Sequence, residues 1–114
     1  ENIQIIINAI LSNPKFIGGS NNLDSNLIKI SNRNIFCKGG AEGVFLFVHL
    51  KKEIFGILKV KDGNERALSS AMNALLKKFK ILDKEELNQF NSWNTSSMYN
   101  HAKIKIGSIS TKIE

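Results

Sequence analysis

Three short runs of strand-forming residues lie close together between residues 35 and 60, and they constrain the fold more than any other part of the sequence. The runs are residues 35–37, 44–50 and 54–60. Valine, isoleucine and phenylalanine dominate the last two runs, and these residues suit a pleated sheet. The links are too short for crossover connections, so we predict an antiparallel meander. The continuous apolar run at residues 44–50 predicts a central strand buried on both faces.

Apolar residues recur at helical spacing in three other segments. Over residues 3–11, isoleucine and leucine occupy positions i, i+3, i+4, i+7 and i+8, and Pro14 ends this pattern. Residues 23–30 predict a second, short helix. Residues 65–80 predict the longest helix, because six apolar positions follow one face and lysines lie in the last turn.

The C-terminal part of the chain has weaker patterns. Residues 83–90 predict a short turn of helix, and residues 91–100 predict a polar linker around Trp93. Lysine and isoleucine alternate over residues 103–106, which is typical of an edge strand. The residues beyond are expected to fray.

These features together predict an α+β fold, in which helices pack on an antiparallel sheet of three to four strands. A chain of 114 residues suits one small domain that buries about two thirds of its unfolded surface. We therefore expect a single domain over residues 1–114, with residues 91–114 as a loosely packed tail.

The charge balance does not favour a specific nucleic-acid site. Lys and Arg number 16 against 10 Asp and Glu, for a net charge of +6, but Arg33 and Arg66 are the two arginines. A nucleic-acid reader is expected to cluster its basic residues and to use arginine for bidentate contacts. Here the lysines are scattered along the chain, so weak attraction to polyanions is the simpler expectation.

The number of cysteines and the hydropathy of the chain bear on its location in the cell. Cys37 is a single cysteine, so it makes no intrachain disulfide and cannot by itself form a thiolate zinc site. No run of about 20 apolar residues and no signal-peptide pattern is found. We expect a cytoplasmic protein without a bound metal or other cofactor and without a membrane-spanning segment.

A glycine-containing segment joins the first two predicted strands. Its residues are Lys38-Gly39-Gly40-Ala41-Glu42-Gly43. Glycine lets the backbone adopt positive φ or approach a ligand closely, and the segment also carries a cation and a carboxylate. By pattern alone, glycines beside strands more often form a plain turn or bulge.

The longer pattern resembles the L-asparaginase II family. These are bacterial serine-dependent amidohydrolases, related in fold to serine β-lactamases and glutaminases, and they carry a Lys-x-Gly-Ala-Glu-Gly signature in their C-terminal region. The upstream match covers Asn13-Pro14, Gly18-Gly19 and Leu23-Asp24-Ser25-x-Leu27-Ile28, and the downstream match covers Lys59, Asp62-Gly63-Asn64 and Arg66-Ala67. Asn22 stands where the family has an arginine. The resemblance covers nearly the whole chain, but it corresponds to only the C-terminal third of a complete family enzyme.

The resemblance implies a substrate site around the glycine segment. The strand that ends at Lys38 would form one wall of the cleft, as in the C-terminal part of a serine β-lactamase-like fold. Lys38 would offer its charge to the substrate carboxylate or to the proton network of the nucleophile, and Gly39 and Gly40 would let the substrate approach. Glu42 would either orient Lys38, bind the substrate amine or brace the loop.

Other chemistry-bearing residues have structural explanations in the sequence. Asp62 is expected to form a turn or cap, and Arg66 to make an ion pair in the first helical turn. Strand alternation places Cys37 opposite Lys38, as a buried and inert thiol. His49 lies in an apolar strand and is expected to belong to the core. The serine pairs Ser69-Ser70 and Ser96-Ser97 lack the Ser-x-x-Lys spacing that would activate a hydroxyl.

Three functional hypotheses follow. By resemblance, the chain is an amidohydrolase that converts asparagine to aspartate and ammonia, but it lacks the acylating serine and its lysine. It is therefore expected to be a truncated protein, inactive alone, that acts on a small amino-acid amide only if a separate N-terminal half complements it. The alternatives are a module that binds a small ligand or a partner chain, including a second copy of itself, and a remnant without function.

Overall fold

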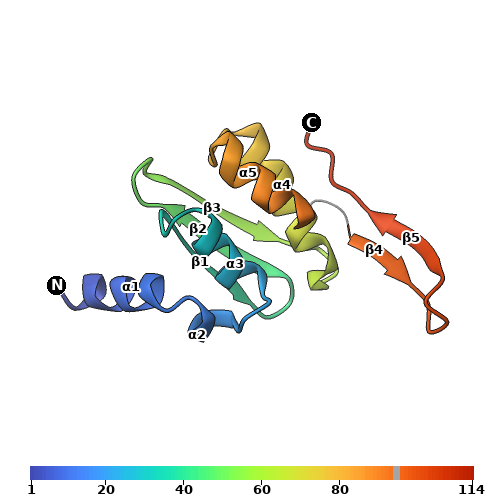
Figure 1. Ribbon diagram of the computed structural model, residues 1–114, viewed down its shortest axis with the longest axis horizontal. Helices are drawn as coiled ribbons and strands as arrows, with labels where there is room; N and C mark the ends of the chain where they lie inside the picture. Colours follow the sequence, from blue (N-terminus) through green and yellow to red (C-terminus); the bar gives the residue numbers. More distant parts are fainter. Residues whose placement is uncertain (94–95) are drawn as a thin grey trace.

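The computed structural model describes residues 1–93 and 96–114 of the chain. Its elements are α1 (Asn2–Ser12), α2 (Lys15–Gly18), α3 (Leu23–Ile30), β1 (Ile35–Gly40), β2 (Val44–His49), β3 (Ile54–Lys59), η1 (Glu65–Ala67), α4 (Leu68–Lys78), α5 (Lys84–Phe90), η2 (Asn91–Trp93), β4 (Ser96–Tyr99) and β5 (Lys105–Ile109). The fold is α+β, as the sequence predicts, with a sheet of three strands and a separate sheet of two. The molecule measures 50 × 27 × 26 Å, with α1 at one end and the β4–β5 ribbon at the other (Figure 1). No helix among the described residues is long and apolar enough to cross a membrane.

The predicted meander is confirmed, in the order β1-β2-β3 with both pairs antiparallel. The turn between β1 and β2 depends on left-handed backbone at Glu42 (φ 60°) and Gly43 (φ 68°). A Cβ at Gly43 would lie 2.8 Å from Cβ of Val60, so this position needs glycine for space as well as for its φ.

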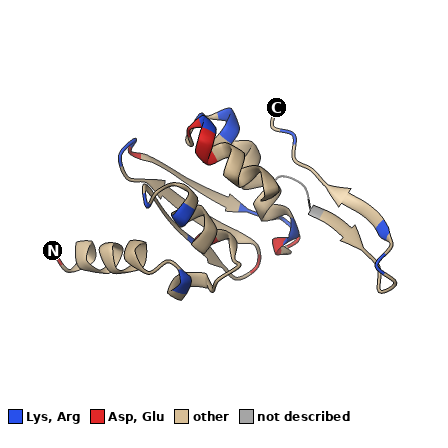
Figure 2. Ribbon diagram, viewed as in Figure 1, with Lys and Arg blue, Asp and Glu red and all other residues tan. Residues whose placement is uncertain are grey.

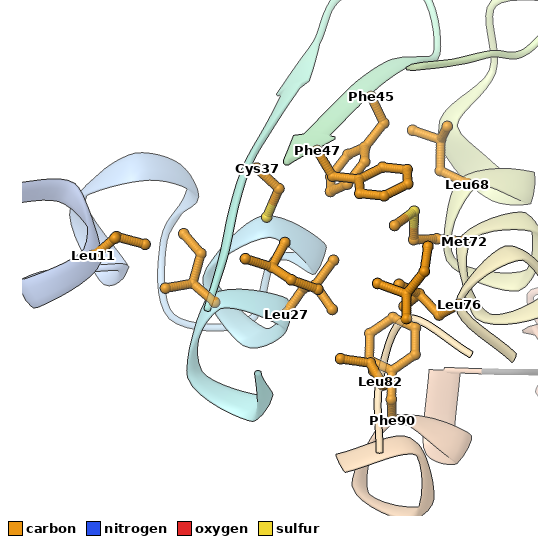
Figure 3. Packing of buried hydrophobic residues seen from close by; sticks show 13 residues of the cluster. Leu11, Leu27, Cys37, Phe45, Phe47, Leu68, Met72, Leu76, Leu82 and Phe90 are labelled. Carbon is orange, nitrogen blue, oxygen red and sulfur yellow. The ribbon is translucent and has the colours of Figure 1, made fainter. Parts of the chain in front are cut away.

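One face of the sheet carries the core. Phe45, Phe47 and His49 of β2 are buried on this inner face, against helices α3 and α4. In Figure 3, Phe45 and Phe47 point toward Leu68 and Met72 of α4. Burying each large apolar side chain contributes about 1.5–3 kcal/mol, so this face supplies much of the stability.

The other face of the sheet is open, which corrects the prediction that β2 is buried on both faces. The residues of this outer face alternate with the buried residues along each strand. This outer face consists of Phe36, Lys38, Val44, Leu46, Val48, Phe55, Ile57 and Lys59. The continuous apolar run of β2 suggested cover on both sides, but α3 and α4 pack on the inner face, and α1 and α2 approach the outer face only beside Phe36 and Lys38 of β1. Leu46 is therefore 37% exposed.

The helices agree with the sequence patterns except at their ends. α1 and α3 form where the apolar spacing predicts them, and α2 is a short helix that the sequence did not indicate. The segment predicted as one helix over residues 65–80 begins as the 3-10 turn η1, capped by the side chain of Asn64, and ends at Lys78. Lys52 stabilises this end, because its Nζ donates to the carbonyl oxygens of Lys80 (3.0 Å) and Ile81 (2.6 Å).

The C-terminal prediction is partly wrong. In place of a polar linker over residues 91–100, the structure has η2 and then β4, while residues 94 and 95 of that linker lie outside the described residues. The last strand is Lys105–Ile109 and not residues 103–106. It pairs with β4 and not with the edge of the main sheet. A hydrogen bond from Thr111 Oγ1 to Ser70 Oγ (3.0 Å) ties the end of the chain to α4.

Candidate functional site

A polar cleft of about 460 Å³ lies beside the free edge of β1. Its walls are the N-terminal turn of α3, the last residues of β1 with the loop that follows, the start of α4 and Trp93. Of the four residues predicted to bind substrate, Lys38, Gly39 and Gly40 line this cleft, and Glu42 does not. The volume is in the range of small-molecule sites.

A buried carboxylate organises the cleft. Asp24 is 4% exposed, in the first turn of α3. Its Oδ2 accepts a hydrogen bond from the Gly39 backbone N–H (3.2 Å), and its Oδ1 accepts one from the Ser25 N–H (3.2 Å). The same Oδ2 lies 3.6 Å from Nζ of Lys38. A buried charge is stable only when it is paired and hydrogen-bonded, and these three groups supply that compensation.

Lys38 reaches this carboxylate around the edge of the sheet. By alternation its side chain starts on the outer face, opposite to Cys37. Because β1 is an edge strand, the side chain can bend around the free edge toward Asp24, where its amine also donates to the Gly39 carbonyl. The side chain remains 47% exposed, so its positive charge is available at the cleft mouth.

Gly18 makes room for the carboxylate. A Cβ built on Gly18 would lie 2.1 Å from Oδ1 of Asp24, a distance that no methyl group could occupy. At Gly40, by contrast, the nearest atom to such a Cβ is in Val44, at 3.7 Å, which is an ordinary contact. The steric requirement for glycine therefore falls on α2, behind Asp24, and not on the end of β1.

Glu42 lies at the tip of the β1–β2 turn and is exposed. Its contribution there is made by the backbone, since its carbonyl oxygen accepts from Nζ of Lys59 (2.6 Å). Among the described residues, no hydrogen bond joins the Glu42 side chain to Lys38.

The remaining candidates have the structural roles expected of them. Cys37 is buried, its Sγ donates to the Asp24 carbonyl oxygen (3.4 Å), and burial raises the pKa of this thiol. His49 is buried as well, and its Nδ1 accepts the Lys52 N–H (3.2 Å). Burial lowers the pKa of His49. Asp62 forms a turn with the Asn64 N–H and an ion pair with Arg66 (2.8 Å).

The serines of the described residues do not form a catalytic pair with lysine. Ser69 lines the cleft and is half-buried, while the neighbouring Ser70 is buried and accepts from Thr111. Ser25 donates to the Pro14 carbonyl oxygen (2.9 Å). Within residues 1–93 and 97–114, no serine hydroxyl bonds to a lysine amine. No cluster of His, Cys, Asp and Glu in these ranges could hold a metal ion.

Asp24 is a buried cleft residue that the sequence did not single out. Asp24 belongs to the segment that resembles the family, but the sequence assigns no role to it. A signal was present, because Asp24, Leu27 and Ile28 share one face of the predicted helix at i, i+3 and i+4. A carboxylate on an otherwise apolar helix face indicates a buried charge with a specific partner.

Comparison with known proteins identifies the family of the chain. The L-asparaginase II family model matches residues 1–111 of the chain. A search of curated proteins finds no match. The matched region contains the whole cleft, with Asp24, Lys38, Gly39 and Gly40 in the segments that align with the family. The chain belongs to the L-asparaginase II family.

Proposed function

We propose that the chain supports hydrolysis of asparagine or a closely related amino-acid amide, and that its cleft binds the substrate. The observation that supports this proposal is the half-exposed Lys38 ammonium, which is held 3.6 Å from the buried Asp24 carboxylate at the mouth of the cleft. A substrate of this class carries a carboxylate, which a fixed ammonium recognises by a charge-assisted hydrogen bond. The family resemblance implies a serine β-lactamase-like cleft, in which the strand that ends at Lys38 would form one wall.

Asp24 makes this recognition directional. The carboxylate is anchored by two backbone N–H groups, so it holds the Lys38 amine at one place beside Gly39. Its own charge is largely compensated by these partners. The outward-facing part of the Lys38 amine is thus left for an anionic ligand. Because the ammonium is already held in place, its contact with the ligand is stronger than that of a mobile side chain.

The chemical step needs a nucleophile from outside the described residues. In amide hydrolysis through an acyl-enzyme, a serine oxygen bonds to the amide carbon, the C–N bond breaks and ammonia leaves with a proton. Water then hydrolyses the ester to give aspartate and the free serine. We propose that a second polypeptide, corresponding to the N-terminal half of a complete family enzyme, supplies this serine in the cytoplasm.

Ammonia release in the presence of asparagine tests the proposal. The chain is assayed alone, with the polypeptide encoded immediately upstream, and with Lys38→Met in the same mixture. Ammonia from the wild-type mixture alone, with kcat/KM lower by at least about 10-fold in Lys38→Met, is the expected result when the charge-assisted contact with the substrate carboxylate is removed. Ammonia from the isolated chain would place the nucleophile within it. The absence of ammonia from every mixture would overturn the proposal.

A binding module remains as the second candidate, and the intact Lys38–Asp24 pair without a catalytic serine favours it. In this case the cleft would hold aspartate or asparagine without turnover. Titration calorimetry with both ligands separates the two functions. Heat from either ligand with the chain alone, lost in Lys38→Met and not followed by ammonia release in any mixture, is expected of a binding module.

A further inference from the structure

Two polar side chains of the cleft make no hydrogen bond or ion pair with the residues that the structure describes. They are the carboxylate of Glu65, in η1, and the hydroxyl of Ser69, in the first turn of α4. The other charged or amide side chains that line the cleft bond to the protein itself. Asn22 donates to a backbone carbonyl oxygen, and Asp24 and Lys38 form their ion pair. The described residues thus leave a carboxylate and a hydroxyl for a ligand.

Glu65 and Ser69 lie on the same side of the cleft. They are four positions apart, so they lie about one turn apart along the helical segment that η1 and α4 form. Trp93 lies on this side as well, because η2 packs against α4, and its ring is stacked on Phe90. A carboxylate and a hydroxyl accept hydrogen bonds from an ammonium group, and an indole ring attracts its charge. This side of the cleft therefore suits a cation.

A single aromatic ring separates this side of the cleft from the side that carries Lys38. Phe45 lines the cleft between them. Its side chain points toward Leu68 of α4 (Figure 3), and a Cβ built on Gly39 would lie 3.7 Å from Cδ2 of the same ring. Lys38 directly precedes Gly39, and Glu65 lies three positions before Leu68. A small ligand that lies over this ring can therefore contact both Lys38 and Glu65.

The charges on the two sides match those of an α-amino acid, which carries a carboxylate and an ammonium group on the same carbon. Lys38 supplies the cation for the carboxylate. The acidic residues that line the cleft are Asp24 and Glu65. Asp24 is buried and already paired, whereas Glu65 is exposed to the cleft. Glu42, which the sequence suggested for the substrate amine, does not line the cleft, so Glu65 is the carboxylate placed to receive this group.

We propose that Glu65, assisted by Ser69, binds the α-ammonium group of the ligand and restricts the cleft to α-amino acids and their amides. This inference rests on the proposed function, because Lys38 must bind the carboxylate of the same ligand. Succinamate, which is asparagine without its amine, satisfies Lys38 but leaves the Glu65 carboxylate without a cation. A site built to pair with a polar group discriminates against an analogue that lacks this group, because its own partner is then left unpaired.

A carboxylate at this position also complements the dipole of the helical segment, and a matched control separates the two roles. Glu65 follows its cap Asn64 in the first turn of η1, and Glu85 lies in the first turn of α5 after its cap Asp83. Figure 2 shows acidic residues at the start of α5, at the opposite end of the α4–α5 pair from η1. Glu85→Gln therefore removes the same charge from a comparable helix position away from the cleft.

Titration calorimetry with L-asparagine and with succinamate tests the role of Glu65. The wild-type chain is expected to bind asparagine at least about 5-fold more tightly than succinamate. Glu65→Gln should weaken asparagine binding by at least about 5-fold and leave succinamate binding unchanged, and Ser69→Ala should weaken asparagine binding by about 2–3-fold. Glu65 is exposed, so circular dichroism should show an unchanged fold. Glu85→Gln should bind both ligands as the wild type does.

Lys38→Met separates failure of this inference from failure of the proposed function, because it should weaken the binding of both ligands. Equal binding of asparagine and succinamate, lost in Lys38→Met and unchanged in Glu65→Gln, would overturn the role of Glu65 and leave the proposed function in place.

The same variants are compared by ammonia release in the mixture with the polypeptide encoded immediately upstream. Asparagine and succinamate both release ammonia when their amides are hydrolysed, so the ratio of their kcat/KM values decides the question where the chain alone gives no heat. A ratio that favours asparagine and falls in Glu65→Gln is the expected result. The absence of both heat and ammonia with either compound would overturn this inference together with the proposed function.

Discussion

The Asp24 carboxylate lies 3.6 Å from the Lys38 ammonium, and the two groups differ sharply in exposure, at 5% and 47% of their side chains. The carboxylate is thus a fixed internal group, and the ammonium is the part of the pair that meets solvent and ligand. This asymmetry explains how one edge strand can present a positioned charge to the cleft. It also predicts that the two residues differ in their effects on stability.

Replacement of Asp24 by alanine is expected to destabilise the chain by about 1–3 kcal/mol, because the Gly39 N–H loses its acceptor in a buried position. Urea unfolding followed by circular dichroism measures the loss. Asp62→Ala is the control, since its ion pair with Arg66 is exposed and is expected to contribute less than about 1 kcal/mol. Equal losses in the two variants would contradict the buried anchoring of Asp24.

A methyl group at Gly18 is expected to collide with the same carboxylate. The clash at 2.1 Å predicts that Gly18→Ala costs about 1–3 kcal/mol, whereas Gly40→Ala meets only ordinary contacts. In the Asp24→Ala background the clash is absent, so the additional cost of Gly18→Ala should largely vanish. A double-mutant cycle by urea unfolding gives this coupling directly. Additive losses would show that Gly18 is required for another reason.

The sequence was most informative where local chemistry determines the structure. The turn residues around Gly43 and Asp62 and the strand-forming runs predicted the meander, and the apolar spacing predicted α1, α3 and most of α4. Lys38, Gly39 and Gly40 were found as a group because they are adjacent in the sequence. Their neighbour Glu42 lies outside the cleft because two left-handed residues reverse the chain at that point.

Features that depend on tertiary packing were not visible in the sequence. The apolar run of β2 is compatible with cover on one face or on both, and only the placement of the helices decides between them. The pairing of β4 with β5 joins residues on either side of a loop that carries weak turn signals. Asp24 and Lys38 are 14 positions apart, and their contact requires α3 to pack beside the edge of β1.

Stability is expected to fall in mild acid because of His49. Burial lowers its pKa in the folded chain below the ordinary value of 6.5. The folded state therefore favours the neutral ring, and its stability is complete above pH 6.5 and decreases as the pH falls through 6.5 toward the folded pKa. His49→Asn keeps an acceptor for the Lys52 N–H but does not titrate. The free energy of unfolding of this variant should therefore depend less on pH than that of the wild type. His101→Asn, at an exposed position, is the control, and an equal slope in His49→Asn and the wild type would contradict the prediction.

The Cys37 thiol is expected to resist alkylation in the folded chain. Two effects act together, since the side chain is fully buried and burial with the nearby Asp24 charge raises its pKa, which removes the reactive thiolate. Labelling by iodoacetamide at pH 8 should therefore follow opening of the structure and not the intrinsic reactivity of a thiol. The rate is measured by mass spectrometry, in buffer and in increasing urea, and it should rise in parallel with the unfolded fraction.

Asp24→Ala destabilises the contact between α3 and β1 that covers the thiol. Labelling of this variant in buffer should therefore be faster by at least about 5-fold, as its loss of stability of about 1–3 kcal/mol requires. Rapid labelling of the wild-type chain in buffer would instead mean that α3 does not cover Cys37 in solution, and the anchoring of Asp24 beside β1 would fail with it.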